Sequence, residues 1–228
     1  MSFYFIKTPT VVQRFFEKYV WSFSMESSKQ KAIYLTFDDG PTPKITEWTL
    51  DTLKKYNAKA TFFCIGKNVE NHPDIIQKII DNKHSIGNHT HNHFNGWKTN
   101  KKDYIENVLI AEKIISSTLN LQQQTTTNHQ LSTKLFRPPY GKIRSSQAKQ
   151  LIKKGYKIIM WDVLSADFDK SISKEKCLDN VLKNTRNGSI IVFHDSLKAK
   201  NNLKYVLPKV LEHFKKEGYQ FSSIALPN

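Results

Sequence analysis

The sequence predicts an α/β protein in which short buried strands alternate with amphipathic helices. After residue 31, apolar runs of strand length are separated by segments whose apolar residues recur at helical spacing. This alternation favours a parallel sheet, because a helix can carry the chain back to the start of the next strand. The pattern leaves an open α/β fold and a closed barrel as alternatives, and it contains no clear internal repeat.

An N-terminal extension, residues 1–30, precedes this alternation. It contains apolar side chains at helical spacing that predict one short amphipathic helix: Val11, Val12, Phe15, Phe16, Tyr19 and Val20. Such a stripe usually packs on its own domain, although the flanking basic residues Lys7, Arg14 and Lys18 also permit peripheral contact with a membrane. The polar segment SMESSKQK then indicates a linker to one main domain, residues 31–228.

Six apolar runs within the main domain are predicted to be strands: AIYLTF, ATFFCI, HSIG, LF, YKIIMW and SIIVFH. Helical patterns cover residues 43–56, 68–82, 101–119, 144–154, 174–185 and 203–217. Pro43 and Pro73 suit the beginnings of two of these helices, since the first turn needs no N–H donor from proline. The polar, aperiodic segment 121–134 predicts a surface loop.

The composition is that of a globular protein of 228 residues, with 39% hydrophobic residues and a formal net charge of +15. A large positive charge suggests an acidic partner. The lysines, however, are dispersed at helix-like spacing, which is typical of solvated helix faces, so we expect no specific nucleic-acid binding. We expect a monomer.

The sequence shows neither a membrane-spanning segment nor an export signal. No run approaches the ~18 apolar residues of a transmembrane helix. The N-terminus lacks the pattern of a signal peptide, so the sequence by itself predicts a cytoplasmic protein without classical export, with export by another route or a start other than residue 1 as the alternatives. The chain has two cysteines, which excludes a disulfide framework, and Cys64 in the apolar run TFFCIG is predicted to be a buried free thiol.

Charged and metal-binding residue types cluster where the predicted strands end. In chain order, all the predicted strands except ATFFCI end in or are followed by such residues: Asp38 and Asp39, His89 and His93, Arg137, Asp162 and Asp167, and His194 and Asp195. Parallel strands place all of their C-terminal ends on one face, and in a barrel that face carries the active site. Five of the six predicted strands end in this way, which indicates a catalytic or metal-binding site.

Two histidines and two aspartates in this set suggest a metal ion. His89 and His93 have the i, i+4 spacing that points two imidazoles the same way on a helical turn, whereas His91 would lie on the opposite side. Adjacent ionised carboxylates repel each other unless a cation is near, although Asp38 and Asp39 could also form a solvated turn. One aspartate with both histidines would suit zinc or a similar cation, and the other could accept a proton from water.

Five segments carry a specific resemblance. TFDDGP, GNHTHNH, FRPPYG, WDVLSADF and IIVFHD resemble, in order, the five motifs of the polysaccharide deacetylase family, which is also known as carbohydrate esterase family 4 or the NodB-homology domain. They span residues 36–195. The resemblance implies a distorted, seven-stranded (β/α) barrel that removes acetyl groups from N-acetylated or O-acetylated sugars, with residues 31–228 as the deacetylase domain.

The resemblance also implies a metal centre with a base beside it. Asp39, His89 and His93 would bind a divalent metal ion, for which zinc is the first expectation and Co2+, Ni2+ and Mn2+ are alternatives. Asp38 would be the catalytic base, and Arg137 would pair with it.

Three further positions are implied by the same resemblance. The backbone N–H of Tyr140 would help to stabilise the oxyanion. His194 would be the general acid for the leaving amine, and Asp167 would orient it. This agrees with the chemistry of amide hydrolysis, which needs a proton donor for a poor leaving group near neutral pH.

The chain departs from the family pattern near the substrate. Leu164 stands where the family often has aspartate, Phe168 stands where it often has tryptophan, and FNGW follows His93. An acetylated glycan containing N-acetylglucosamine, such as peptidoglycan or a chitin-like oligomer, is the expected substrate. An O-acetyl esterase acting on xylan-like polymers and a noncatalytic glycan- or metal-binding relative are the alternatives.

Overall fold

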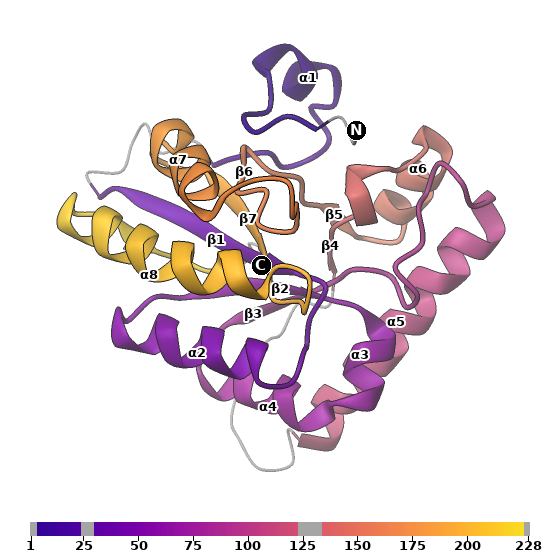
Figure 1. Ribbon diagram of the computed structural model, residues 1–228. Helices are drawn as coiled ribbons and strands as arrows, with labels where there is room; N and C mark the ends of the chain where they lie inside the picture. The colour runs from indigo at the N-terminus through magenta and orange to yellow at the C-terminus, as the bar shows by residue number, and fades with distance from the viewer. Residues whose placement is uncertain (1–3, 24–29, 123–133, 226–228) are drawn as a thin grey trace.

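The computed structural model describes residues 4–23, 30–122 and 134–225. Its centre is a parallel sheet that curls into a half-barrel, and the strands follow the order β5-β4-β3-β2-β1-β7-β6 (Figure 1). The short strand β8 pairs with the beginning of β1. The strands are β1 (Ala32–Asp38), β2 (Ala60–Cys64), β3 (Ser85–Asn88), β4 (Leu135–Phe136), β5 (Lys157–Ile158), β6 (Val163–Leu164), β7 (Ile190–His194) and β8 (Gln220–Phe221). The predicted α/β fold with a seven-stranded, distorted barrel is thus confirmed.

Helices surround the curled sheet on its outer side (Figure 1). They are α2 (Ile45–Lys55), α3 (Gly66–Asn71), α4 (Pro73–Asp81), α5 (Lys101–Gln122), the 3₁₀ turn η2 (Pro139–Gly141), α6 (Ser145–Lys153), α7 (Lys174–Asn184) and α8 (Lys200–Lys216). The single helix predicted over residues 68–82 is wrong, because α3 ends before His72 and Pro73 begins a new helix. The predicted loop 121–134 begins with the last two residues of α5, and its residues 123–133 lie outside the described residues.

The central strand β1 separates an apolar face from a polar one. Leu35 and Phe37 are fully buried, and the Phe37 ring stacks on Phe62 and Phe193 at 5.0 and 5.8 Å between centroids. Because side chains alternate along a strand, Thr36 and Asp38 point to the opposite face. There they contact a buried arginine, so the alternation of β1 places polar groups inside the half-barrel.

Residues 4–23, here called the N-terminal arm, lie against the two strands that end the sheet order. Val20 pairs in parallel fashion with Ile159 after β5, and Lys7 pairs in antiparallel fashion with Val163 in β6. The backbone N–H of Met160 donates to the carbonyl of Val20 at 2.7 Å. The arm therefore fills the space between β5 and β6, and its helix α1 (Thr10–Phe15) stands above them (Figure 1).

The apolar stripe of the arm is divided between core and solvent. Val12 and Tyr19 pack against the core, whereas Val11 and Phe16 are exposed and Phe15 is 80% exposed. The predicted amphipathic helix is therefore present but spans only six residues, and only part of its stripe packs on the domain. Within the described residues, no helix is long and apolar enough to cross a membrane.

A buried ion pair fixes the arm to the sheet. Asp162 is fully buried, and its Oδ2 accepts hydrogen bonds at 2.6 Å from both Lys7 Nζ and Ser189 Oγ. A buried carboxylate is costly unless it is paired and hydrogen-bonded, so the lysine of the arm satisfies a charge that the sheet carries.

Cys64 and Cys177 are also buried and are free thiols, as predicted for Cys64.

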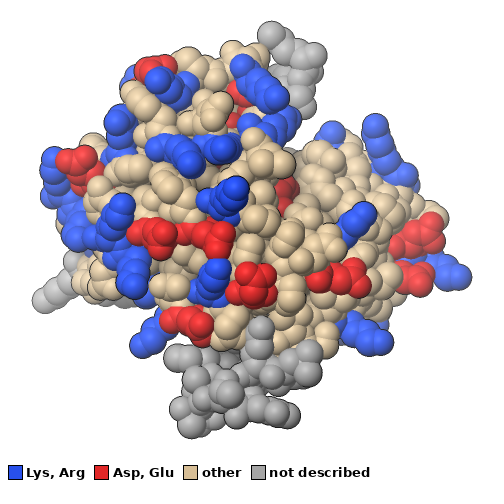
Figure 2. Space-filling model, turned by 60° about the horizontal axis from the view of Figure 1, so that its bottom comes forward, with Lys and Arg blue, Asp and Glu red and all other residues tan. Residues whose placement is uncertain are grey.

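The surface charges are dispersed. Figure 2 shows lysine and arginine side chains spread over the face in view, with acidic side chains between them. This is the distribution expected of solvated helix faces. The absence of specific nucleic-acid binding stays a prediction.

Candidate active site

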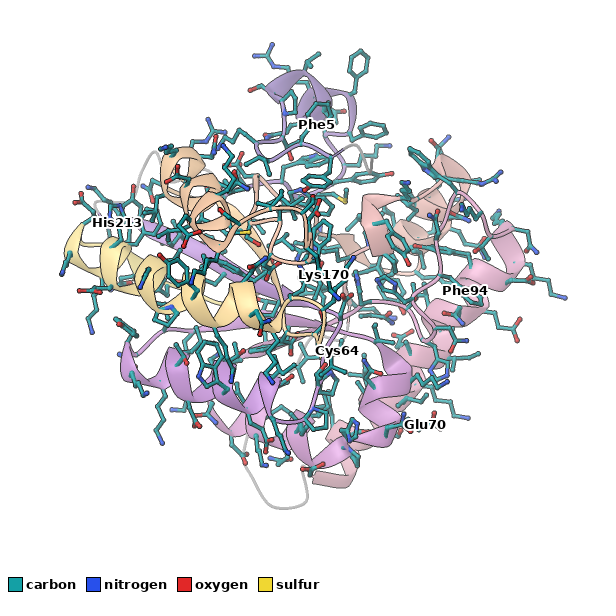
Figure 3. The ribbon with its side chains drawn as sticks, viewed as in Figure 1. Phe5, Cys64, Glu70, Phe94, Lys170 and His213 are labelled. Atoms are coloured by element: carbon teal, nitrogen blue, oxygen red, sulfur yellow. The ribbon has the colours of Figure 1, made fainter. Side chains whose placement is uncertain are left out.

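The candidate site lies where β1, β3, β4 and β7 end. Asp38 and His194 are register partners in β1 and β7, and Asn88 and Phe136 are partners in β3 and β4. His89 and Arg137 directly follow the latter pair, so four chemically active groups come to one edge of the sheet. Figure 3 labels Cys64, the last residue of the neighbouring β2, near the middle of the molecule.

Asp39, His89 and His93 bring together three side-chain atoms that could bind a metal ion. The Oδ1 atom of Asp39 lies 3.1 Å from His93 Nε2 and 3.7 Å from His89 Nε2, and the three ligand atoms lie within 4.8 Å of one another. The second ring nitrogen of each histidine is engaged elsewhere. His89 Nδ1 lies 2.7 Å from the carbonyl oxygen of Arg137, and His93 Nδ1 lies 3.0 Å from the Tyr140 hydroxyl. Such contacts orient an imidazole so that Nε2 faces a metal ion.

The loop that carries both histidines is not the helical turn that their spacing predicted. Residues 89–93 have no helical hydrogen bonds, and both Thr90 and His93 have positive φ, at 63° and 56°. Side-chain hydrogen bonds shape the loop instead. Asn107 Oδ1 accepts from the backbone N–H groups of His91 and Asn92, and Thr90 Oγ1 accepts from that of Phe94. The imidazoles converge because the loop folds back, and the i, i+4 argument was wrong about the reason.

The protonation of His89 and Asp39 suits a cation. Burial lowers the pKa of His89 to about 4, so its imidazole is neutral near pH 7, as metal binding requires. Burial opposes ionisation of Asp39, but the hydrogen bond with His93 and the charges of His194 and His89 hold the pKa of Asp39 well below its ordinary value. One ionised carboxylate and two imidazoles with converging ligand atoms fit a divalent metal ion.

Asp38 is held by a buried guanidinium. Arg137 is fully buried, and its Nη1 donates to Asp38 Oδ1 at 2.7 Å and to Thr36 Oγ1 at 2.6 Å. Its other nitrogens donate to the carbonyl oxygens of Met160 and Ile159 at 2.9 and 3.1 Å. These four acceptors fix the guanidinium, which in turn fixes Asp38. The sequence analysis missed Thr36, although its position two residues before Asp38 puts both on the same face of the strand.

His194 and Asp167 form a second charged pair. His194 Nδ1 lies 2.8 Å from Asp167 Oδ1, and the backbone N–H of His194 donates to Oδ2 at 2.9 Å. Burial lowers the pKa of His194, but the charge and hydrogen bond of Asp167, with the charges of Asp39 and Asp38, raise it to about 9. The imidazole is therefore protonated near pH 7 and can donate a proton.

An aromatic wall flanks His194 and reaches the N-terminal arm. The ring of Phe168 meets His194 edge-on at 4.9 Å between centroids, and Tyr4 of the arm meets Phe168 at 5.5 Å. The Tyr4 hydroxyl donates to Asp169 at 2.6 Å. The sequence analysis assigned no such contact to the extension, because nothing in its pattern marks Tyr4 as a neighbour of residue 168.

Tyr140 contacts the site at His93. It belongs to η2, has φ of 60°, and is 60% exposed. Its side chain reaches His93, whereas the proposed use of its backbone N–H for an oxyanion stays a prediction.

Asp195 lies beside the strand end that carries Asp38 and Asp39. It is fully buried and its Oδ2 accepts from Thr46 Oγ1 at 2.5 Å, while burial raises its pKa to about 7. A Cβ on Gly40 would lie 2.1 Å from Asp195 Oδ2, which explains why glycine follows the two aspartates. The glycine was the only hint of this contact in the sequence.

Comparison with known proteins identifies relatives over nearly the whole chain. The family model described as polysaccharide deacetylase matches residues 26–159. A peptidoglycan-N-acetylglucosamine deacetylase of Bacillus cereus is 34% identical over 213 residues, which are 93% of this chain and 72% of the relative. The peptidoglycan-N-acetylmuramic acid deacetylase PdaA of Bacillus subtilis is 32% identical over 210 residues, 91% of this chain and 75% of the relative.

Solved structures show the same fold. The crystal structure of the peptidoglycan N-acetylglucosamine deacetylase Bc1960 superposes with a TM-score of 0.80 at 33% identity and covers 92% of this chain and 94% of that one. The Xyl-CE4 domain of a multidomain xylanase from the hindgut metagenome of Trinervitermes trinervoides has a TM-score of 0.75 at 28% identity, covering 86% and 88%. With the family model matching more than half of its residues, the chain belongs to the polysaccharide deacetylase family.

Proposed function

We propose that this protein is a metal-dependent hydrolase that removes acetyl groups from N-acetylglucosamine-containing glycans, with peptidoglycan as the leading substrate. The observation that carries the proposal is the arrangement of three groups at one edge of the sheet. A set of three metal-binding atoms lies beside an arginine-paired carboxylate and near a histidine that is protonated at neutral pH. The relatives that act on peptidoglycan support the substrate class.

In this proposal Asp39, His89 and His93 hold the metal ion, for which zinc is the first expectation. Bound there, the ion would polarise the acetyl carbonyl and lower the pKa of a water molecule. Contacts at the Nδ1 atoms of His89 and His93 orient both imidazoles so that their Nε2 atoms face Asp39.

The remaining residues move protons and stabilise charge. Asp38 accepts a proton from the water that attacks the acetyl carbon, and Arg137 holds the carboxylate in position. The backbone N–H of Tyr140 is assigned to the oxyanion that develops on the carbonyl. His194 donates its proton to the amide nitrogen as the C–N bond breaks, so acetate and a free amine leave, and Asp167 stabilises the protonated imidazole.

A direct assay tests the proposal. Acetate release would be measured from N-acetylglucosamine oligomers, soluble peptidoglycan fragments and acetylated xylan, each before chelation, after chelation and after addition of zinc. We expect release from the N-acetylated substrates, loss on chelation and recovery with zinc.

Two alternatives predict other results. The likeness to the Xyl-CE4 domain favours acetylated xylan as the competing substrate, and preferential release from it would replace the proposed activity by O-acetyl esterase activity. A pseudoenzyme of Bacillus anthracis shares the fold at a TM-score of 0.72 and 25% identity. A protein with this fold can therefore be noncatalytic. Absence of release from every substrate in the presence of metal would favour that role.

A further inference from the structure

The loop after His93 exposes a tryptophan that the site described above does not use. Trp97 is 57% exposed, although tryptophan is among the more buried residue types on average. It belongs to the segment FNGW, where this chain departs from the expected family pattern. An exposed indole in a loop that carries a metal-binding residue calls for a role of its own.

The indole is held in place rather than free to rotate. Trp97 Nε1 donates to the carbonyl oxygen of Ile143 at 3.3 Å, and the Trp97 backbone N–H donates to Asn95 Oδ1 at 3.0 Å. Arg144 Nη2 donates to the carbonyl of Trp97, and Lys142 Nζ lies 5.2 Å from the ring centroid on one face. The side chain thus keeps a large exposed area in a fixed orientation.

Close packing also joins the loop to the segment after Tyr140. The backbone N–H of Gly96 donates to the carbonyl of Lys142 at 3.1 Å, and a Cβ on Gly96 would lie 2.5 Å from that oxygen. Gln147 Nε2 bridges the two segments by donating to the carbonyls of Gly96 and Thr99 at 2.9 and 3.1 Å. Hydrogen bonds and close packing therefore join residues 95–99 and 142–147 into one unit.

This unit is continuous with the candidate active site. Ile143, which accepts the indole hydrogen bond, lies three residues after Tyr140, and three residues span at most ~11 Å. The Tyr140 hydroxyl lies 3.0 Å from His93 Nδ1, and the Tyr140 ring is 60% exposed. Two exposed aromatic side chains, Tyr140 and Trp97, therefore belong to connected segments beside the three metal-binding atoms.

We propose that Trp97 is a stacking platform for a sugar of the glycan chain beyond the residue that is deacetylated. This inference rests on the proposed function. An indole buries a large apolar area with little loss of conformational entropy and offers a flat face to the apolar face of a pyranose. Because the loop is already fixed, binding loses little further freedom. The platform gives the enzyme a preference for longer N-acetylglucosamine chains over disaccharides.

Three variants separate a platform from a structural anchor. Trp97→Ala removes both the ring and the N–H group, whereas Trp97→Phe keeps a smaller aromatic face and removes the hydrogen bond to Ile143. Phe15→Ala removes another exposed aromatic, 80% exposed in the N-terminal arm, and serves as the matched control. Each variant would be checked for its melting temperature against the unaltered protein.

Binding and turnover would be measured on the N-acetylglucosamine pentamer and dimer. Calorimetric titration of the metal-free protein reports binding without catalysis, and acetate release reports kcat/KM of the zinc-loaded enzyme. We expect Trp97→Ala to weaken pentamer binding about tenfold, the effect of losing one aromatic stacking contact, and to leave dimer values within about twofold. Trp97→Phe should keep most of the affinity, and Phe15→Ala should change nothing.

The contrary results are equally specific. Equal loss on pentamer and dimer, or the same loss in Trp97→Phe as in Trp97→Ala, would show that Trp97 only anchors the loop and would overturn the inference. Unchanged pentamer binding in Trp97→Ala would overturn it as well. If the unaltered protein binds the pentamer through Trp97 yet deacetylates no glycan, the proposed function fails while the platform stands.

Discussion

Replacing Asp39 by asparagine should abolish metal binding, whereas the same replacement of Asp38 should leave the metal in place. Asp39 supplies the only carboxylate among the three clustered ligand atoms, and its Oδ1 lies 3.1 Å from His93 Nε2. Asp38 is not among those three ligand atoms, and its Oδ1 lies 2.7 Å from Arg137 Nη1. The two adjacent aspartates therefore divide into a ligand and a base.

The expected magnitudes follow from these contacts. Loss of a residue that only orients a ligand costs roughly 10- to 100-fold in metal affinity, so loss of Asp39 itself should cost more than ~100-fold. Asp38→Asn removes the proton acceptor, and kcat should fall by ~10²- to 10⁴-fold. Asparagine can still accept from Arg137, but the buried guanidinium loses its counter-charge, so the free energy of unfolding should fall by about 3–5 kcal/mol.

Metal content by elemental analysis, zinc titration and acetate release would be measured on both variants and on the unaltered protein. Thermal unfolding would confirm that each variant is folded. Loss of metal in Asp38→Asn as severe as in Asp39→Asn would refute the division of roles. Near-normal turnover in Asp38→Asn would refute the base assignment alone.

The other predictions concern the acid and the arm. His194→Ala should retain metal and lose most amide hydrolysis, yet lose less on an activated acetyl ester, which needs little help from an acid; equal losses on the two substrates would contradict a general-acid role. The pKa of His194 is raised to about 9, so the protonated form and the activity that needs it should persist at neutral pH and decline as the pH rises through about 9. Asp167→Asn should move that decline to lower pH, and a pH–rate profile that does not move would count against the pair. Lys7→Met should lower the free energy of unfolding by about 1–3 kcal/mol and the melting temperature by ~2–4 °C per kcal/mol, because buried Asp162 loses a cation, whereas exposed Lys18→Met should have little effect.

The fold class and the residues at the strand ends could be predicted from the sequence, because both depend on local signals. Apolar runs and helical periodicity are read residue by residue, and residues such as Asp38 and His194 follow such runs directly. Parallel pairing then placed these ends on one face, as the register of Asp38 with His194 shows.

The sequence could not show what depends on three-dimensional packing. The two-residue strands β6 and β8 were not among the predicted apolar runs, and β8 is a strand because it pairs with β1. The loop 89–93 takes its shape from Asn107 in α5. Asn107 lies 16 and 15 residues along the chain from the two residues whose N–H groups it binds. The contact of Tyr4 with Phe168 joins positions more than 160 residues apart, and no local signal could predict it.

The N-terminal arm has a consequence for where this domain can be cut. The match to the family model begins at residue 26, after the arm ends. A fragment beginning there would leave backbone groups of Ile158, Met160 and Leu164 without the partners that the arm provides. Uncovered sheet edges pair readily with other chains, so the fragment should self-associate or exchange strands between molecules. In the chain that includes the N-terminal arm, the arm covers these edges.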